Sequence, residues 1–500
     1  MNTKINLLFL SLLMFSQYGY SQKTQYSIRD FGAVGDGITV CTDAINSAII
    51  KCSENGGGMV IIPEGIFKSG TVMMKSNVEL HLEMGSTLLA STDYKDFPRQ
   101  PQPEYRSQKD PGGWFALIYA EGISNMAITG FGTIDGNGAL QKPVPGTPGG
   151  DRDGRPRNIL LISCRQVRIE GIRMLNSGIW NQHYLNCEDV IVDRIEVYNH
   201  SNRNNDAVDI DGCRRFVLSN SILDSDDDGI TLKSTGTAST EDVTITNCTV
   251  SSFCNAIKAG TESTGGFRNI NISNCVIRPS RCESEKKVFG SYRGLSGISL
   301  EIVDGGVMEG VAISNITIEG TECPLFIRLG NRARKHTDSA SVPPVGKLRN
   351  VTISNIVAYN TGNTCSSITA IPGHYIENVI IDNIQIFNTG GIINGQYAAT
   401  HQEAPEIDDG YPEAIMWGNL PSSVFFIRHA KGISITGLMF GSKGDDPRIP
   451  VIAVDVERLR LGKSIFSGVS IPPCFALLEN VKEFDIEKPL GWGDHPLISK

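Results

Sequence analysis

The most regular feature of this chain is a repeated pattern of apolar and polar residues. Each copy has a triplet with apolar first and third residues, followed by a polar pair and another apolar pair. The clear triplets are VRI at 167, VIV at 190, FVL at 216, VTI at 243, INI at 270, VAI at 311, VTI at 351 and VII at 379, with weaker copies VEL at 78, MAI at 126 and ISI at 433. Such alternation predicts strands that bury one face. Most of the clear copies start 23 to 28 residues apart, but two longer gaps, after 270 and after 311, leave room for an outward loop or an extra coil.

An asparagine recurs four residues after the start of the triplet. It is found at Asn220, Asn247, Asn274, Asn315, Asn355 and Asn383. Asparagine tolerates the left-handed backbone conformation, and its amide can hydrogen-bond to the equivalent residue of the next coil. A strand–bend–strand unit with a period in the twenties is typical of a parallel β-helix, in which each coil covers the next. Leucine-rich repeats would need Leu-x-x-Leu-x-Leu spacing, and a β-propeller would need about 40 residues per unit.

The pattern therefore predicts an all-β fold, a parallel β-helix formed as a single-stranded solenoid, with residues 23–500 as one domain. A short helix that caps one end is expected in TDAINSAIIKCSE, where Ala44, Ala48 and Ile49 recur at helical spacing and three glycines follow.

Two stretches lack the repeat and are predicted to form loops. Residues Pro98–Asp153 are rich in proline, glycine and charge, and loops on one side of a solenoid commonly line a binding groove. Residues His401–Trp417 are acidic and aromatic, and we expect them to close the far end of that groove.

Residues 1–22 are typical of a secretory signal. Lys4 supplies the positive charge, Ile5–Phe15 the apolar run and Gly19–Ser21 a small-residue exit. The apolar run is too short to span a membrane. The alternative to a secretory signal is a buried N-terminal helix. We expect an exported protein, either periplasmic or extracellular.

Composition narrows the class of protein further. The net charge of −9 argues against binding to nucleic acid or insertion into a membrane, but local cations could still bind an acidic polymer. The twelve cysteines would allow disulfides after export. However, Cys164, Cys187 and Cys213 each stand three residues before a strand core, which favours stacks of buried free thiols. No cysteine pair or Cys/His cluster has the spacing of a zinc site, and we expect a monomer without a metal.

The candidate chemistry lies between Asn204 and Ser234. Aligning DAVDIDG with DGITLKS places Asp206 on Asp228, beside Asp227, at the bend before a strand. Continuing the alignment to NAIKAG and back to WNQHYLNC adds four residues to the same edge: Asn255, Lys258, Trp180 and His183. Equivalent residues on neighbouring coils lie about 4.8 Å apart, so the three carboxylates are predicted to be close neighbours.

Crowded carboxylates repel one another, which raises the pKa of at least one of them. A protonated acid beside an ionised carboxylate can hydrolyse a glycosidic bond, since one protonates the leaving oxygen and the other activates water or attacks the sugar. Two other interpretations of the same aspartates stay open. They could cap the backbone N–H groups of a turn, or they could bind calcium.

The chain resembles glycoside hydrolase family 28, the polygalacturonases and their relatives, over nearly all of residues 23–500. The resemblance is carried by DFGAVGDG, GGGMVIIPEGIFKSG, HLEMGSTLLAS, GTIDGNG and SGIWNQHYLNCEDV, with Asn204–Asp206 matching the family N-T-D motif and Asp227–Asp228 the D-D motif. It implies a right-handed β-helix and hydrolysis with inversion. It also implies that Asp227 is the general acid, that Asp206 and Asp228 position and deprotonate water, and that no cofactor is needed.

The chain departs from two other family motifs. Asn255 stands where the G-H-G motif has its histidine, and Ser299–Glu301 stands where the R-I-K motif has the cations that grip a substrate carboxylate. Lys258 and Arg328, which we align with Ser299, are candidates to supply substitute charge. Trp180 could stack on a sugar or join two coils, and His183 could contact substrate or be purely structural.

We therefore predict a hydrolase that acts on a pectic polysaccharide or oligosaccharide of the galacturonan or rhamnogalacturonan type. Its catalytic residues would be Asp206, Asp227 and Asp228. Further substrate contacts would come from Asn204, Trp180, His183, Asn255, Lys258 and Arg328. The departures favour an exo-acting or side-chain-directed enzyme. Two alternatives are a non-catalytic carbohydrate-binding β-helix and a β-helical polysaccharide lyase.

Overall fold

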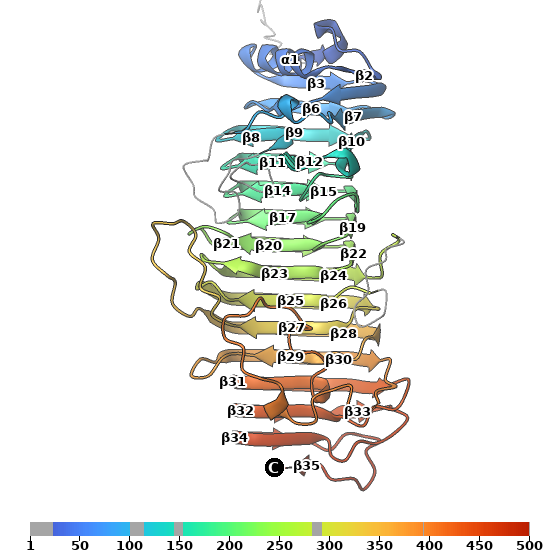
Figure 1. Cartoon of the computed structure of the whole chain (residues 1–500), viewed down its shortest axis with the longest axis vertical. Helices are drawn as coiled ribbons and strands as arrows, with labels where there is room; N and C mark the ends of the chain where they lie inside the picture. Colours follow the sequence, from blue (N-terminus) through green and yellow to red (C-terminus); the bar gives the residue numbers. More distant parts are fainter. Residues whose placement is uncertain (1–23, 101–114, 145–153, 283–292, 394, 500) are drawn as a thin grey trace, which may run out of the picture.

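The computed structural model describes residues 24–100, 115–144, 154–282, 293–393 and 395–499. The chain winds into a right-handed parallel β-helix whose coils stack along the long axis of the molecule (Figure 1). The fold predicted from the repeat is confirmed. The predicted signal, residues 1–22, lies outside the described residues. Within the described ranges, no helix is both long and apolar enough to cross a membrane.

Each coil contributes strands to three parallel columns. The first column, which carries the candidate site, contains β5 (Val72–Met73), β8 (Ala116–Glu121), β11 (Arg157–Ile162), β14 (Gln182–Leu185), β17 (Val208–Asp211), β20 (Ile230–Ser234), β23 (Asn255–Ser263), β25 (Ser296–Ile302), β27 (Cys323–Leu329), β29 (Ser366–Thr369) and β35 (Ile498–Ser499). The second contains β1 (Gln25–Ser27), β3 (Gly58–Ile62), β6 (Val78–Leu82), β9 (Ser124–Gly130), β12 (Arg165–Glu170), β15 (Glu188–Asp193), β18 (Arg214–Ser219) and β21 (Thr240–Thr246).

The third column completes each coil. It contains β2 (Asp36–Val40), β4 (Gly65–Ser69), β7 (Ser86–Ala90), β10 (Thr133–Asp135), β13 (Arg173–Leu175), β16 (Glu196–Asn199), β19 (Ile222–Ser225), β22 (Thr249–Ser252) and β33 (Ser464–Phe466). Longer strands run through a bend and pair in two columns or, for β31, in all three: β24 (Phe267–Ile277), β26 (Val307–Glu319), β28 (Lys347–Thr361), β30 (Ile376–Asn388), β31 (Ser422–Ser442), β32 (Ile449–Leu461) and β34 (Ala476–Ile486).

The apolar residues of the repeat stack inside the coil. Val208 pairs with Ile230 and Ile210 with Leu232, and all four side chains are fully buried. Burying a side chain of this size contributes about 1.5–3 kcal/mol, and every coil repeats the contribution. The interior of the β-helix is therefore the hydrophobic core, and the coils are held in one register.

The repeated asparagines occupy the bends as predicted. Asn220, Asn247, Asn274, Asn315, Asn355 and Asn383 all have a left-handed backbone, with φ between 52° and 57°. The side chain of Asn315 donates to Asn274 Oδ1 at 3.1 Å and accepts from Asn355 Nδ2 at 3.0 Å. Asn383 donates in turn to Asn355 at 2.8 Å. The asparagines thus form a hydrogen-bonded ladder along one edge of the stack.

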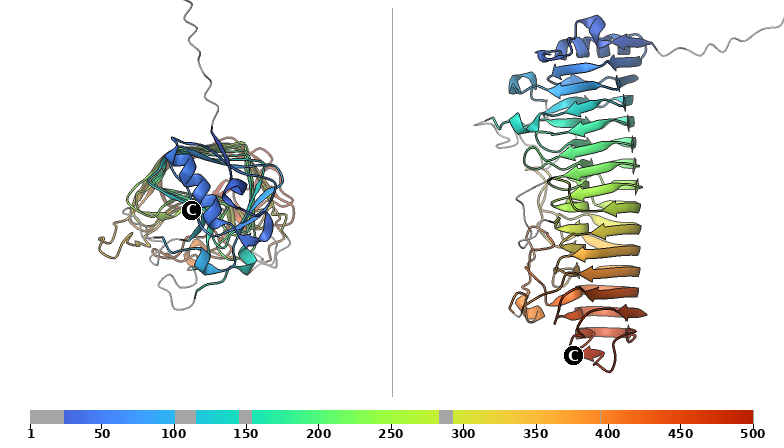
Figure 2. Two further views of the ribbon diagram at one scale, coloured as in Figure 1. Left: turned by 90° about the horizontal axis from the view of Figure 1, so that it is seen from above. Right: turned by 90° about the vertical axis from the view of Figure 1, so that its right-hand side faces the viewer.

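Both ends of the core are covered. Helix α1 (Thr42–Glu54) lies across the N-terminal end, where it buries Ile45, Ala48, Ile49 and Cys52 (Figure 2). Its position and its end before the glycines were predicted. At the C-terminal end the fully buried Trp492 packs on Phe440, Phe466 and Phe475, with ring centroids 5.2–6.4 Å apart.

The predicted loops need one correction. Residues 116–135 within the stretch 98–153 contain β8, β9 and β10, which pair in register with β11, β12 and β13 of the next coil. Residues 101–114 and 145–153 lie outside the described residues. Neither of the two long gaps in the repeat holds an extra coil, since β24 pairs directly with β26 and β26 with β28.

All twelve cysteines are free thiols, and all except Cys254 and Cys282 are buried. The N–H of Cys187 donates to the sulfur of Cys213 on the next coil at 3.4 Å. The predicted stacks of thiols are therefore confirmed.

Candidate active site

The three predicted carboxylates meet at one bend of the β-helix. Asp206 lies just before β17, and Asp227 and Asp228 lie just before β20, on the next coil. The strand register pairs Val208 with Ile230, which sets Asp206 beside Asp228. The alignment read from the sequence is thus the alignment of the coils.

The carboxylates line a small polar cavity on the first column of strands. The residues around it are Arg157, Ile179, Trp180, Asn204, Asp206, Asp227, Asp228, Lys233, Glu262 and Tyr411. All of these residues except Tyr411 belong to the coils from β11 to β23. Tyr411 comes from a segment that is distant in the sequence.

Asp228 is held by three donors. The main-chain N–H and the side-chain amide of Asn255 donate to its Oδ1 at 3.1 Å and 2.8 Å, and Lys258 Nζ lies 3.2 Å from its Oδ2. Burial alone would raise the pKa of Asp228, but the charges of Lys258 and Lys233 and the hydrogen bonds from Asn255 outweigh burial. The pKa therefore lies below its ordinary value, and Asp228 stays ionised.

The two other aspartates are shifted in the opposite direction. Burial, together with the charge of Asp228, raises the pKa of Asp227. Burial, together with Asp209 and Asp227, raises the pKa of Asp206 well above its ordinary value. The side-chain amide of Asn204 lies 3.4 Å from Asp227 Oδ2. A protonated carboxyl thus stands beside an ionised one, which is the pairing that acid–base hydrolysis needs.

Lys233 is the central cation of the cavity. Its Nζ lies 3.4 Å from Asp209, 3.6 Å from Glu262 and 3.8 Å from Asp206, and it sits over the ring of Trp180 at 4.7 Å from the centroid. Burial opposes its charge, but the surrounding carboxylates raise the pKa of Lys233 well above its ordinary value. Lys233 therefore stays charged and partly neutralises the acidic cluster.

The alternatives of turn capping and calcium can be weighed against this geometry. The N–H of Asp228 does donate to Asp227 Oδ1 at 3.0 Å, so turn capping occurs in the same groups. Among the described residues, Asp227, Asp228 and Cys254 lie close enough together to share a metal ion. The ammonium of Lys258 already contacts Asp228, however, and a lysine disfavours a second cation at the same oxygen.

The predicted substrate contacts divide into two groups. Trp180 and Asn204 line the cavity, although Trp180 is only 7% exposed and its ring already contacts Lys233 and Arg157. Asn255 and Lys258 are 1% and 2% exposed and lie behind Asp228.

His183 belongs to the buried group. It is fully buried, and its Nε2 lies 3.1 Å from Asp211 on the next coil. The prediction of a direct sugar contact does not fit its position, because the first-column strands are covered there on both faces.

Arg328 also requires a correction. It pairs in register with Glu301, not with Ser299, because the alignment across the loop after β25 was displaced by two residues. The guanidinium is buried, and it donates to the carbonyl oxygens of Ala370, at 2.9 Å, and of Ile407. Arg328 therefore anchors the main chain and does not face the cavity.

We predicted that the segment His401–Trp417 closes the far end of the groove, and this prediction needs a correction. The segment instead lies beside the candidate site, where Tyr411 lines the cavity. Tyr411 accepts a hydrogen bond from Thr261 Oγ1 at 3.2 Å and covers the ammonium of Lys258 at 5.7 Å from its ring centroid. Glu413 lies near enough to Lys258, Asp228 and Asp227 for their charges to affect its pKa, which burial raises.

Sequence reasoning did not identify several residues of the site. Lys233 could have been found, because it stands on the coil that carries Asp227 and Asp228. Glu262 and Arg157 stand on other strands of the first column, β23 and β11. Tyr411 and Glu413 carry no such signal. Their segment has no repeat register with the carboxylates, so only the folded chain shows that they meet.

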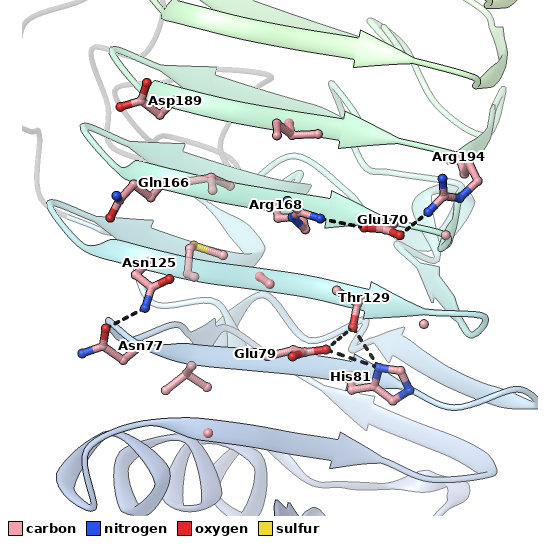
Figure 3. Close-up of a pocket in the computed structure, with 18 of the residues that line it drawn as sticks. Asn77, Glu79, His81, Asn125, Thr129, Gln166, Arg168, Glu170, Asp189 and Arg194 are labelled. Atoms are coloured by element: carbon pink, nitrogen blue, oxygen red, sulfur yellow. Dashed lines mark hydrogen bonds and ion pairs between the residues drawn. The ribbon is translucent and has the colours of Figure 1, made fainter. Parts of the chain in front are cut away.

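A broad hollow with many polar side chains lies elsewhere, over β6, β9, β12 and β15 (Figure 3). Its polar side chains mostly pair with one another. Asn125 donates to Asn77 at 2.9 Å, Thr129 donates to Glu79 at 2.6 Å, and Arg168 lies 3.5 Å from Glu170 (Figure 3). The first two pairs join neighbouring coils, and Arg168 with Glu170 is a pair within β12, so we interpret this surface as structural.

The fold and the paired aspartates define the class of protein as a right-handed parallel β-helix with a clustered acidic site. Residues 52–401 match the model of glycosyl hydrolases family 28, and the chain belongs to this family. Among curated relatives, it is 27% identical to a probable polygalacturonase of Vitis vinifera, over 64% of this chain and 66% of that protein. It is also 27% identical to an exo-poly-alpha-D-galacturonosidase of Dickeya chrysanthemi, over 41% of each. The chain thus spans less than two thirds of the length of these relatives.

Solved structures share the fold. The family 28 exopolygalacturonase of Yersinia enterocolitica superposes with a TM-score of 0.66 at 18% identity, over 93% of this chain and 79% of that chain. The exopolygalacturonase of Thermotoga maritima superposes with a TM-score of 0.61 at 24% identity, over 73% of this chain and 87% of that one.

Proposed function

We propose that this protein is an exported hydrolase that cleaves glycosidic bonds in pectic polysaccharide with inversion at the anomeric carbon. The observation that carries the proposal is the geometry of the site: Asp227 and Asp228 are adjacent, Asp206 lies beside Asp228 on the neighbouring coil, and Asn255 and Lys258 donate to Asp228. The directions of the pKa shifts, upwards for Asp227 and downwards for Asp228, agree with this geometry. Family membership and the polygalacturonase relatives support the pectic substrate.

Asp227 protonates the leaving oxygen, since its raised pKa keeps a proton available at weakly acidic pH. Asp228, ionised between Asn255 and Lys258, removes a proton from the attacking water. Asp206 stands beside it on the neighbouring coil and positions that water. The cavity is about 80 Å³ in volume, so only the reacting linkage enters it and the sugar rings extend outside.

The segment around Tyr411 and Glu413 limits the site on one side and favours attack near a chain end. The names of two similar proteins, an exo-poly-alpha-D-galacturonosidase and an exopolygalacturonase, are consistent with that mode. The proposed enzyme acts as a monomer and needs no cofactor.

The test is to incubate the protein with pectic oligosaccharides and to follow the first products by proton NMR. The proposal expects a reducing sugar whose anomeric configuration is opposite to that of the cleaved bond. Short products at early times would indicate action at a chain end. Retained configuration, ultraviolet-absorbing unsaturated products, or no cleavage at all would refute it.

A further inference from the structure

A histidine outside the candidate site lies between two carboxylates. His429 stands on β31, and its Nδ1 lies 2.8 Å from Asp455 on β32. Its Nε2 lies 3.1 Å from Glu406, which belongs to the segment His401–Trp417. The histidine is only 8% exposed. His429 thus joins the coils of the β-helix to the segment that brings Tyr411 to the cavity.

The two acidic partners require a charged imidazole. An ionised carboxylate only accepts hydrogen bonds, and a neutral imidazole has a single N–H donor, so only the imidazolium donates to Asp455 and Glu406 at once. Burial opposes this charge, but the hydrogen bonds to Glu406 and Asp455 and the negative charges of both groups raise the pKa of His429 above its ordinary value of 6.5. The direction of this shift agrees with the geometry.

Glu406 stays ionised in this contact. Burial raises its pKa, but the hydrogen bond from His429 and the positive charges of Arg428 and Arg328 outweigh burial, so the pKa of Glu406 lies below its ordinary value. The guanidinium of Arg428 lies 3.2 Å from the Glu406 carboxylate. Glu406 is therefore an acceptor at the pH values at which the histidine titrates.

Two further titratable groups lie near the histidine. The ring of Tyr375 faces His429 edge-on, with ring centroids 6.5 Å apart. The ammonium of Lys431 lies over the Tyr375 ring at 4.2 Å from its centroid and 3.7 Å from Glu457. Neither contact occupies a ring nitrogen of His429.

Loss of the histidine proton breaks one of the two hydrogen bonds. The remaining N–H stays with Asp455, the closer partner, which is fixed on β32. Glu406 then faces a nitrogen that no longer donates. Because the pKa of His429 is raised while the segment is in place, its contribution is complete below about pH 6.5 and is lost as the pH rises through the raised pKa.

We propose that His429 is a positioning residue, which in its protonated form holds the segment His401–Trp417, and with it Tyr411, beside the candidate site. Deprotonation of His429 loosens the segment. Tyr411 lines the cavity, so loosening weakens substrate binding and leaves the aspartates in place. The effect on substrate rests on the proposed function, whereas the holding of the segment does not.

A second histidine of the segment provides a matched control. His401 Nε2 lies 3.0 Å from Glu479, and this is the ion pair that the described part of the chain gives it. A neutral imidazole can donate that single hydrogen bond, so loss of a proton does not break it. His401→Gln should therefore leave the response of the segment to pH unchanged.

The first test measures hydrogen–deuterium exchange of residues 401–417 in the full chain between about pH 5.5 and 8.5, corrected for the intrinsic effect of pH on exchange. Protection of the wild-type segment should fall at least about fivefold over this range, because one charge-assisted hydrogen bond is lost. In Glu406→Gln the amide can donate to the neutral ring, so protection should change less than about twofold. Protection that is independent of pH in the wild type, or an unaltered response in Glu406→Gln, would overturn the inference.

The second test measures KM and kcat for pectic oligosaccharides over the same range. The KM of the wild type should rise about three- to tenfold as the pH increases, while the KM of Glu406→Gln stays level and kcat follows one pH profile in both proteins. Asp409→Asn, at an exposed carboxylate of the same segment, should behave as the wild type. An equal rise of KM in the wild type and Glu406→Gln would overturn the role of His429 in substrate binding. Absence of hydrolysis at every pH would overturn the proposed function and leave the exchange result to decide whether His429 holds the segment.

Discussion

At the scale of single residues, the site separates two neighbouring carboxylates by their hydrogen-bond partners. Asp228 receives two hydrogen bonds from Asn255 and an ammonium from Lys258, whereas Asp227 receives one from the N–H of Asp228 and lies near the amide of Asn204. Asn255, which stands where the resemblance to the family places a histidine, supplies two of these donors. The proposed base, Asp228, is therefore held in its ionised form without that histidine.

A prediction about pH follows from Lys258, which lowers the pKa of both aspartates. Activity should fall at low pH as Asp228 gains a proton and at higher pH as Asp227 loses one. In Lys258→Met both pKa values rise, so both limbs of the pH–rate profile should move to higher pH, the acid limb by about one unit or more. Lys463→Met, at an exposed lysine remote from the site, should leave the profile in place.

Measuring kcat/KM against pH for the two variants and the wild type checks this prediction. An unmoved acid limb in Lys258→Met would show that Asp228 is not the titrating base.

The sequence was sufficient to place the carboxylates, because parallel coils convert an alignment of Asp206 with Asp228 directly into proximity. It was not sufficient for His183 and Arg328. Strands of the first column are covered on both faces, so alternation no longer separates groove from interior there. Glu413 was beyond prediction, since its contact depends on a segment that shares no register with the coils.

At the scale of elements, the asparagine ladder fixes the bends between strands. Asn315 combines a left-handed φ of 56° with two side-chain hydrogen bonds, one to each neighbouring coil. Both contributions repeat along the stack, which explains why the sequence revealed this fold so clearly. Successive coils need the same left-handed bend, so asparagine recurs at the same position of the repeat.

Asn315→Ala should lower the free energy of unfolding by about 2–4 kcal/mol, because alanine is strained at a positive φ and both hydrogen bonds are lost. Asn315→Gly removes the hydrogen bonds without the strain and should cost about half as much. Denaturant titration of the three proteins measures both effects. Equal stability of the alanine variant and the wild type would mean that the ladder contributes nothing.

The segment over the site is held by buried arginines. Arg328 donates to Ile407, and Arg428 donates to the carbonyl oxygens of Ala404 and Pro405 at 2.8 Å and 3.2 Å. Trp417 packs against Arg328 and donates to Pro405 at 3.1 Å. These contacts set the position of Tyr411 from a distance.

Arg328→Met removes the hydrogen bonds to the buried carbonyl oxygen of Ala370 and the partly buried one of Ile407, at a cost of about 2–4 kcal/mol. We expect faster limited proteolysis within residues 401–417, together with a raised KM for pectic oligosaccharides. The control is Arg334→Met, at an exposed arginine of the loop after β27. Identical cleavage rates in both variants would show that Arg328 does not anchor the segment.

At the scale of the whole molecule, the β-helix forms one continuous core, capped by α1 at one end and by the aromatic cluster around Trp492 at the other (Figure 1). The stacked cysteines belong to this core and not to covalent cross-links. The repeat predicted both the core and the thiol stacks, whereas the path of the loops could not be read from it.

Titration of thiols in denaturant, without reductant, should therefore give twelve per chain. An exported protein with twelve free thiols is unusual enough for the count to be informative. A value lower by an even number would show that disulfides have replaced some of the stacked thiols.

The central claim is that the adjacent Asp227 and Asp228 act together as an acid and a base, with Asp206 beside them on the neighbouring coil. Its most direct test is the rate of hydrolysis of pectic oligosaccharides by Asp227→Asn, with the fold checked by circular dichroism. We predict an unchanged spectrum and a loss of about 10²–10⁴-fold in kcat, the usual contribution of a general acid. An Asp227→Asn protein that hydrolyses its substrate at the wild-type rate would contradict the account.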